Sequence, residues 1–201
     1  MKEIYDELKK VYDHFTDSYE ITLSVFAKAV DRRSGEEEGH TRRLTSLVTM
    51  LSREMGIDDI EVSEIRCGAL LHDIGTLLIP ESILLKAGGL TDEEWDVIRM
   101  HPIHSHELLS NVPSLKSILD IPYCHHEKWD GTGYPQRLSG DEIPLSARIF
   151  AVVDVYDALL SKRPYREPWP EAMVRSHIRD LSGVHFDPEV VRHFLTLLGE
   201  G

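Results

Sequence analysis

The hydrophobic residues of this chain recur at steps of three and four, the spacing that places them on one face of a helix. The first such run consists of Ile4, Leu8, Val11, Phe15, Leu23, Phe26 and Val30. We expect residues 1–30 to form a helical lead that packs on its own domain. The alternative is a coiled coil that forms a homodimer or relays a signal.

Helical patterns also dominate the rest of the chain. Ser63 is the expected N-cap of a third helix, and Thr91 with Glu94 forms a capping box. Asp187 followed by Pro188 has the sequence of a helix start. No stretch alternates between apolar and polar residues as a strand would. We therefore expect an all-α bundle with an N-terminal helical extension.

Composition narrows the class of protein. The 201 residues carry a formal net charge of −13, which argues against binding to polymeric nucleic acid, because that requires basic faces. No apolar run is long enough for a membrane segment, and the N-terminus does not have the pattern of a signal peptide. Two cysteines, Cys67 and Cys124, are too few for a disulfide framework. These features predict a cytoplasmic protein with reduced thiols.

The candidate chemistry is that of a metal site. The adjacent pair His72-Asp73, in the string LLHDIG, offers one neutral nitrogen and one anionic oxygen. Six further candidate ligands are Glu36, His40, His101, His125, His126 and Asp154. Eight ligands exceed the need of one ion, so we expect a cluster of two or three divalent ions that share Asp73. Nitrogen and oxygen donors without thiolate fit six-coordinate Fe or Mn better than tetrahedral structural zinc.

The spacing of these ligands suggests how they come together. Glu36 and His40 lie four residues apart, so one helical turn would place them on the same face. His125 and His126 point in different directions and can serve two ions. Asp154 is the odd polar residue in an apolar helix, where an unpaired carboxylate is costly. The other histidines, such as His106, we expect to be ordinary surface or core residues.

These ligands lie within longer motifs. In chain order the motifs are GHTRR, LLHDIG, MHP, HHEKWDGTGYP, ARIFAVVDVYDAL, RPYR and VHFDPEVV. Over residues 20–198 the chain resembles the HD-GYP domain, a subgroup of the HD-superfamily metal-dependent phosphohydrolases. The resemblance implies an HD-domain helical bundle, which we assign to residues 31–201. It also implies an iron or manganese centre and, in bacterial second-messenger signalling, hydrolysis of cyclic di-GMP to pGpG, GMP or both.

The resemblance implies roles for single residues. His40, His72, Asp73, His101, His125, His126 and Asp154 match the metal ligands of the family, with Asp73 as the bridging carboxylate. Glu36 matches a position that supports a third metal in some members. His72 and Asp73 are the expected catalytic residues. The substrate contacts implied are Arg163 and Arg166 of RPYR, together with Tyr134 of the signature loop.

One position departs from the family. The residue after HDIG is usually a lysine close to the scissile phosphate, and here it is Thr76. Losing a charge-assisted contact costs roughly one to three orders of magnitude in rate. Weaker turnover, a different cyclic dinucleotide, or another cation such as Lys86 or Lys162 would each account for the change. A non-catalytic sensor of cyclic dinucleotides, or a module that binds a partner, is the rival function.

Overall fold

A computed structural model of the chain describes residues 2–37, 39–162 and 167–200. Its elements are helical, and no strand forms among the described residues. The order is α1 (Lys2–Ser34), α2 (His40–Glu54), α3 (Asp59–Leu70), η1 (Ile74–Leu78), α4 (Glu81–Leu84), α5 (Asp92–Ile98), α6 (His101–Leu109), η2 (Pro113–Ile118), α7 (Asp120–Cys124), η3 (Gly140–Glu142), α8 (Leu145–Leu160), α9 (Glu171–Asp180) and α10 (Pro188–Leu197). The predicted all-α class is confirmed.

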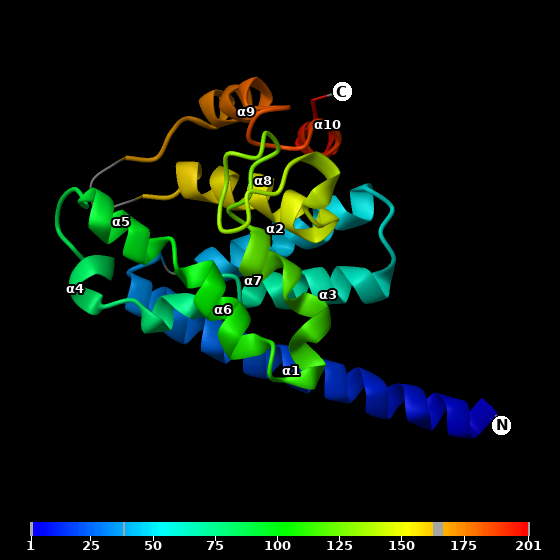
Figure 1. The fold of residues 1–201 in the computed structure, drawn as a ribbon. Helices are drawn as coiled ribbons and strands as arrows, with labels where there is room; N and C mark the ends of the chain where they lie inside the picture. Colours follow the sequence, from blue (N-terminus) through cyan, green and yellow to red (C-terminus); the bar gives the residue numbers. More distant parts are fainter. Residues whose placement is uncertain (1, 38, 163–166, 201) are drawn as a thin grey trace.

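Helix α8 is the centre of the larger hydrophobic core. Phe150 and Val153 on this helix are fully buried, and so is Leu44 of α2. Figure 1 shows α8 between α9 and α10 on one side and α2 on the other. A helix enclosed in this way is apolar around most of its circumference, which accounts for its sequence. Polar residues on α8 therefore stand out as candidates for chemistry.

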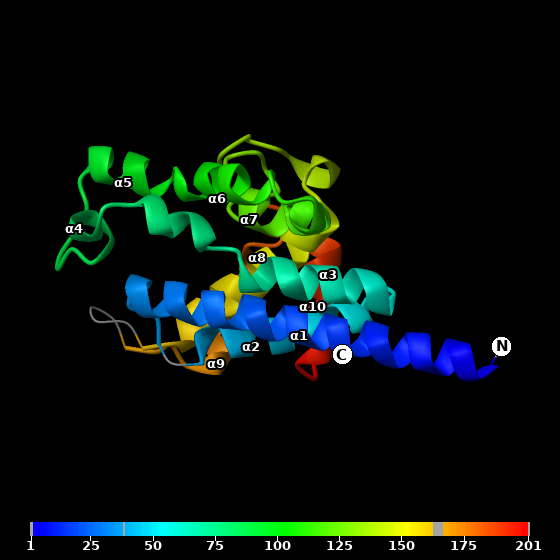
Figure 2. The same cartoon turned by 90° about the horizontal axis from the view of Figure 1, so that it is seen from below.

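Helix α1 has two parts with different surroundings. Leu23, Ala27 and Val30 are buried against the domain, in part within a second hydrophobic cluster. The N-terminal half projects beyond the domain (Figure 2), and its Ile4 and Val11 side chains are 72% and 67% exposed. Although α1 has 33 residues, neither it nor any other helix of the described chain is long and apolar enough to cross a membrane.

Local capping signals located two helix starts correctly and one wrongly. The Thr91–Glu94 capping box and the Asp187 cap are both present. Ser63, however, lies inside α3, and Asp58 is the cap, because its carboxylate accepts from two backbone N–H groups, those of Ile60 and Glu61. The earlier start adds a helical turn and lets Val62 pack into the core.

Candidate metal centre

Seven of the eight predicted ligands come from five separate parts of the bundle. His40 is the first residue of α2, and His101 is the first residue of α6. His125 and His126 directly follow α7, and Asp154 lies within α8. The pair His72-Asp73 occupies the turn between α3 and η1. Side chains from these elements lie close together inside the domain.

The ligands form two groups. One consists of His40, His72 and Asp154, and the other of His101, His125 and His126. Within each group, one ligand atom per residue lies within 4.8 Å of the others. Among the described residues these are the sets of histidine, cysteine and carboxylate side chains close enough to hold an ion. The sequence had predicted every member of both.

Asp73 lies between the two groups. Its Oδ2 atom is 3.4 Å from Nε2 of His72 in the first group. Its Oδ1 atom is 3.3 Å from Nε2 of His101 and 3.7 Å from Nε2 of His125 in the second group. The Asp73 side chain is 27% exposed, whereas those of the three histidines are nearly buried. One carboxylate therefore faces both groups from the side that solvent can reach.

Hydrogen bonds at Nδ1 orient the histidine rings. Backbone carbonyl oxygens accept from Nδ1 of His72 at 2.9 Å, of His101 at 2.8 Å and of His125 at 2.9 Å. A carbonyl can only accept, so each Nδ1 carries a proton, and Nε2 is the ring atom that faces the centre. Partners of this kind commonly fix metal-ligating histidines.

The charges of the site are distributed as a cation would require. His72, His125 and His101 outweigh the effect of burial and hold the pKa of Asp73 well below 3.8. Burial, with the neighbouring His125 and His101, lowers the pKa of His126 well below 6.5. Burial also lowers the pKa of His101. The carboxylate is thus ionised while these two imidazoles stay neutral, and those are the forms that bind metal.

His72 shows the same preference for positive charge. Burial lowers its pKa, but the carboxylates of Asp73 and Asp154 outweigh that effect and raise the pKa to about 10. A position that attracts a proton this strongly also attracts a metal cation.

The donor set fits divalent metal. Nε2 of His101 lies 3.2 Å from Nε2 of His125. Both Nδ1 atoms are engaged by backbone carbonyls, so these two Nε2 atoms are positioned to bind one cation together. Cys67 and Cys124 are buried in apolar clusters, and burial raises their thiol pKa values to about 11 and 12. Nitrogen and oxygen donors without thiolate match the expected composition.

Two details of the predicted geometry differ. His125 and His126, which were expected to serve two ions, both belong to the second group. Glu36 and His40 do not share a helical turn, since Glu36 follows α1 and His40 begins α2. Burial lowers the pKa of His40, but its hydrogen bond to Asp157 outweighs that effect and raises the pKa, and Glu36 lies close enough to contribute to the rise. It belongs to neither ligand group, so its role at a third ion stays a prediction.

The predicted substrate contacts lie in different surroundings. The Tyr134 ring stacks on His126 with centroids 4.7 Å apart, so the signature loop covers the second group. Thr76 is 6% exposed, and its hydroxyl donates to the backbone carbonyl of Asp73. Arg163 and Arg166 lie outside the described residues.

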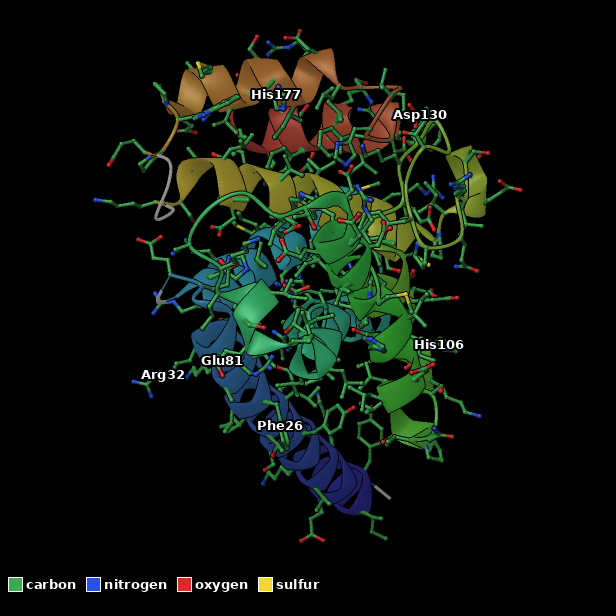
Figure 3. The ribbon with its side chains drawn as sticks, turned by 60° about the vertical axis from the view of Figure 1, so that its left-hand side comes forward. Phe26, Arg32, Glu81, His106, Asp130 and His177 are labelled. Carbon is green, nitrogen blue, oxygen red and sulfur yellow. The ribbon has the colours of Figure 1, made fainter. Side chains whose placement is uncertain are left out.

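Lys86 and Lys162 were considered as substitutes for the lysine that the family resemblance predicts at position 76. Both lie beside carboxylates. Lys86 donates to the carboxylate of Glu94 at 2.6 and 2.8 Å. Lys162 is 68% exposed and 3.8 Å from Glu167. The histidines set aside belong to neither group. The His106 ring lies beside the Tyr123 ring with centroids 4.6 Å apart, and His177 lies on α9 (Figure 3).

Two buried carboxylates near the centre were not among the residues predicted from the sequence. Glu127, 2% exposed, accepts from the backbone N–H groups of Gln136 and Leu138 and so holds the signature loop. Asp157, 3% exposed, accepts from Nδ1 of His40. Glu127 lies in the motif HHEKWDGTGYP, and Asp157 lies in ARIFAVVDVYDAL. A carboxylate at a position where burial is expected was the feature of the sequence that could have identified them.

Comparison with known proteins places this fold and site. The sequence model of the family described as HD domain matches residues 24–190. The chain belongs to the HD domain family. Among curated relatives of this HD domain, a cyclic di-GMP phosphodiesterase of Thermotoga maritima is 40% identical over 196 residues, and the match covers 94% of this chain. A 3'3'-cGAMP-specific phosphodiesterase 2 of Vibrio cholerae is 36% identical over 193 residues, covering 95% of this chain.

A solved structure supports the fold. An HDG"Y"P protein from Bdellovibrio bacteriovorus superposes with a TM-score of 0.68 at 20% identity, covering 92% of this chain and 64% of that one. The HD-GYP resemblance drawn from the motifs is thereby confirmed. The chain spans 53% of the Thermotoga relative and 37% of the Vibrio relative, so each of those proteins contains more than an HD domain.

Proposed function

We propose that this HD domain is a metal-dependent phosphodiesterase that hydrolyses cyclic di-GMP to pGpG, GMP or both. The observation that carries the proposal is the position of Asp73, whose two oxygens face two separate groups of ligands. A shared carboxylate of this kind is what a dinuclear hydrolase requires. The choice of substrate is supported by relatives such as the Thermotoga cyclic di-GMP phosphodiesterase.

Bound divalent ions would supply an activated water near neutral pH and neutralise charge on the phosphate. The chain's own residues contribute position and proton control. Asp73 is the exposed edge of the centre, so substrate can reach it there. Burial and the nearby Asp73 raise the pKa of Tyr134, so its phenol stays protonated and can donate to a phosphate oxygen. Arg163 and Arg166 are proposed to orient the dinucleotide.

We propose iron as the resident metal and manganese as the alternative, with two or three ions in all. The ligand groups support two ions, and Glu36 is the proposed support of a third. Metal content of the anaerobically purified protein, measured by inductively coupled plasma mass spectrometry, tests both points. Two or three equivalents of iron or manganese are expected. Stoichiometric zinc with neither metal would contradict the assignment.

Turnover tests the reaction itself. The purified protein, loaded with Fe(II) or Mn(II), should convert cyclic di-GMP to pGpG or GMP on chromatography. His72→Ala and Asp73→Ala should abolish product formation, because each removes a ligand that faces the centre. A metal-loaded wild-type protein that forms no product would contradict a catalytic role. If calorimetry then showed nucleotide binding, the sensor function would be supported instead.

A second substrate is favoured by one observation. The Vibrio 3'3'-cGAMP-specific relative is 36% identical, close to the 40% of the Thermotoga relative. Parallel turnover measurements with cyclic di-GMP and 3'3'-cGAMP under the same metal loading distinguish the two. We expect the higher kcat/KM with cyclic di-GMP, and the reverse order would reassign the substrate.

We further propose that the protein acts in the cytoplasm and dimerises through the projecting half of α1. Ile4, Tyr5 and Val11 in this half are each more than 60% exposed, and large exposed apolar patches mark interaction sites. Light scattering should report a dimer for the wild type and a monomer for Val11→Glu. A wild-type monomer at micromolar concentration would contradict this assignment.

A further inference from the structure

His40 is held differently from the other oriented histidines of the centre. The Nδ1 atoms of His72, His101 and His125 meet backbone carbonyls. The Nδ1 atom of His40 instead lies 2.8 Å from the Oδ2 atom of Asp157. Its orientation therefore depends on a side chain, which a substitution can remove, whereas the backbone carbonyls remain in any variant.

Asp157 is fixed in place by a buried network. Arg43 approaches it with Nε at 2.5 Å from Oδ1 and with Nη2 at 3.1 Å from Oδ2. Ser161 donates to Oδ2 at 3.3 Å and also accepts from Arg43 at 2.9 Å. The Asp157 carboxylate is only 4% exposed, and the paired guanidinium offsets the cost of burying its charge. These contacts hold the Asp157 carboxylate in a fixed position relative to the His40 ring.

The helix that carries Asp157 also carries a ligand. Asp154 and Asp157 lie three residues apart on α8, so they share one face of that helix. Asp154 belongs to the first ligand group together with His40 and His72. The second group of histidines has no such side-chain support among the described residues. Support from Asp157 is therefore restricted to one of the two groups.

We infer that Asp157 is a positioning residue for one ion of the centre: it accepts the Nδ1 proton of His40 and thereby directs the Nε2 lone pair toward the ion held with His72 and Asp154. The inference rests on the proposed metal centre and does not depend on which cyclic dinucleotide is hydrolysed. It makes the two ions unequal in their dependence on residues outside the ligand set. Loss of such a partner typically weakens metal affinity about 10- to 100-fold.

Asp157→Asn is the informative variant, because it keeps the shape of the side chain but removes its charge and turns an amide N–H₂ toward Arg43 or His40. The matched control is Asp187→Asn. Asp187 is 4% exposed, pairs with Arg148 at 2.7 Å and caps α10 through the N–H of Glu189. Both variants lose a buried carboxylate beside an arginine, so both lose stability, but only Asp157 contacts a ligand.

Mn(II) titrations followed by electron paramagnetic resonance, on protein freed of metal by chelation, measure the outcome. Asp187→Asn should bind two ions, each with the affinity measured for the wild-type protein. Asp157→Asn should bind one ion as tightly as wild type and the other about 10- to 100-fold more weakly. Unchanged affinities in a folded Asp157→Asn protein, or the same loss in Asp187→Asn, would overturn the inference.

If Asp157→Asn does not fold, Asp157→Glu tests the same inference. It retains the negative charge for Arg43 and displaces only the carboxylate from His40, so one ion should again bind more weakly and the other should not. If Asp157→Glu bound both ions with wild-type affinity, the inference would be overturned. A wild-type protein that binds no Mn(II) or Fe(II) would overturn the proposed metal centre itself, which separates the two failures.

Discussion

The hydroxyl of Thr76 donates a hydrogen bond of 2.7 Å to the backbone carbonyl of Asp73. The same residue connects to α1, because Arg33 donates to the Thr76 carbonyl at 2.5 Å and Ser34 lies 3.4 Å from its hydroxyl. The position at which the HD-GYP resemblance predicts a lysine is thus occupied by a short side chain that stabilises the turn holding Asp73.

We expect Thr76→Lys to raise kcat by roughly 10- to 1,000-fold, because it restores a charge-assisted contact to the phosphate. Steady-state turnover of cyclic di-GMP at saturating metal is the measurement. Thr76→Met is the control, since it adds length without charge and should give no increase. If the folded, metal-loaded Thr76→Lys protein turned over no faster than wild type, Thr76 would not be what limits the rate.

Gly75 allows the turn that carries Asp73 to approach the helix that carries His101. A Cβ atom added there would lie 1.9 Å from the His101 carbonyl oxygen and 2.6 Å from the Ser105 nitrogen. Gly75→Ala must therefore push α6 away from η1, and we expect it to lose bound metal and several degrees of Tm. At Gly89 an added Cβ meets nothing within 4 Å, so Gly89→Ala should retain both. Full metal content in Gly75→Ala would show that the two elements move independently of the site.

Glu127 fastens the signature loop. Its carboxylate accepts from the Gln136 N–H at 2.6 Å and from the Leu138 N–H at 3.1 Å. Glu127→Gln replaces one acceptor with an N–H₂ group that faces a backbone donor, so we expect a loss of about 1–3 kcal/mol in the free energy of unfolding. Urea denaturation measures it. Glu142→Gln, at a surface capping position, is expected to cost less, and equal losses would contradict a special role for Glu127.

His185 predicts a pH dependence of stability. Burial, together with Lys128, lowers the pKa of His185 from 6.5 to about 4. As the pH falls below 6.5, His185 becomes protonated in the unfolded chain, whereas in the folded protein it becomes protonated only near pH 4. The free energy of unfolding therefore decreases as the pH is lowered from 6.5 to 4. The loss should be on the order of 2 kcal/mol, allowing for partial exposure. The difference in unfolding free energy between wild type and His185→Gln should shrink by this amount from pH 7 to pH 4. A constant difference would contradict the shifted pKa.

Helix positions were predictable where the signal is local. The Thr91–Glu94 capping box involves four consecutive residues, and its hydrogen bonds depend on little else. The start of α3 was mispredicted because Asp58 and Ser63 are both good caps, and the packing of Val62 decides between them. Choices between equivalent local signals depend on which option buries apolar surface, which the local sequence does not specify.

The sequence by itself determined which residues can serve as ligands of the centre. A histidine or a carboxylate at each motif position limits the donor chemistry whatever the fold, and both ligand groups consist of residues named from the sequence. Only the tertiary structure decided how these residues divide into two groups, which group each oxygen of Asp73 faces, and that Asp157 supports His40 across 117 positions of the chain. Contacts between residues so far apart depend on how α2 and α8 pack together, and helical spacing describes neighbours on one helix only.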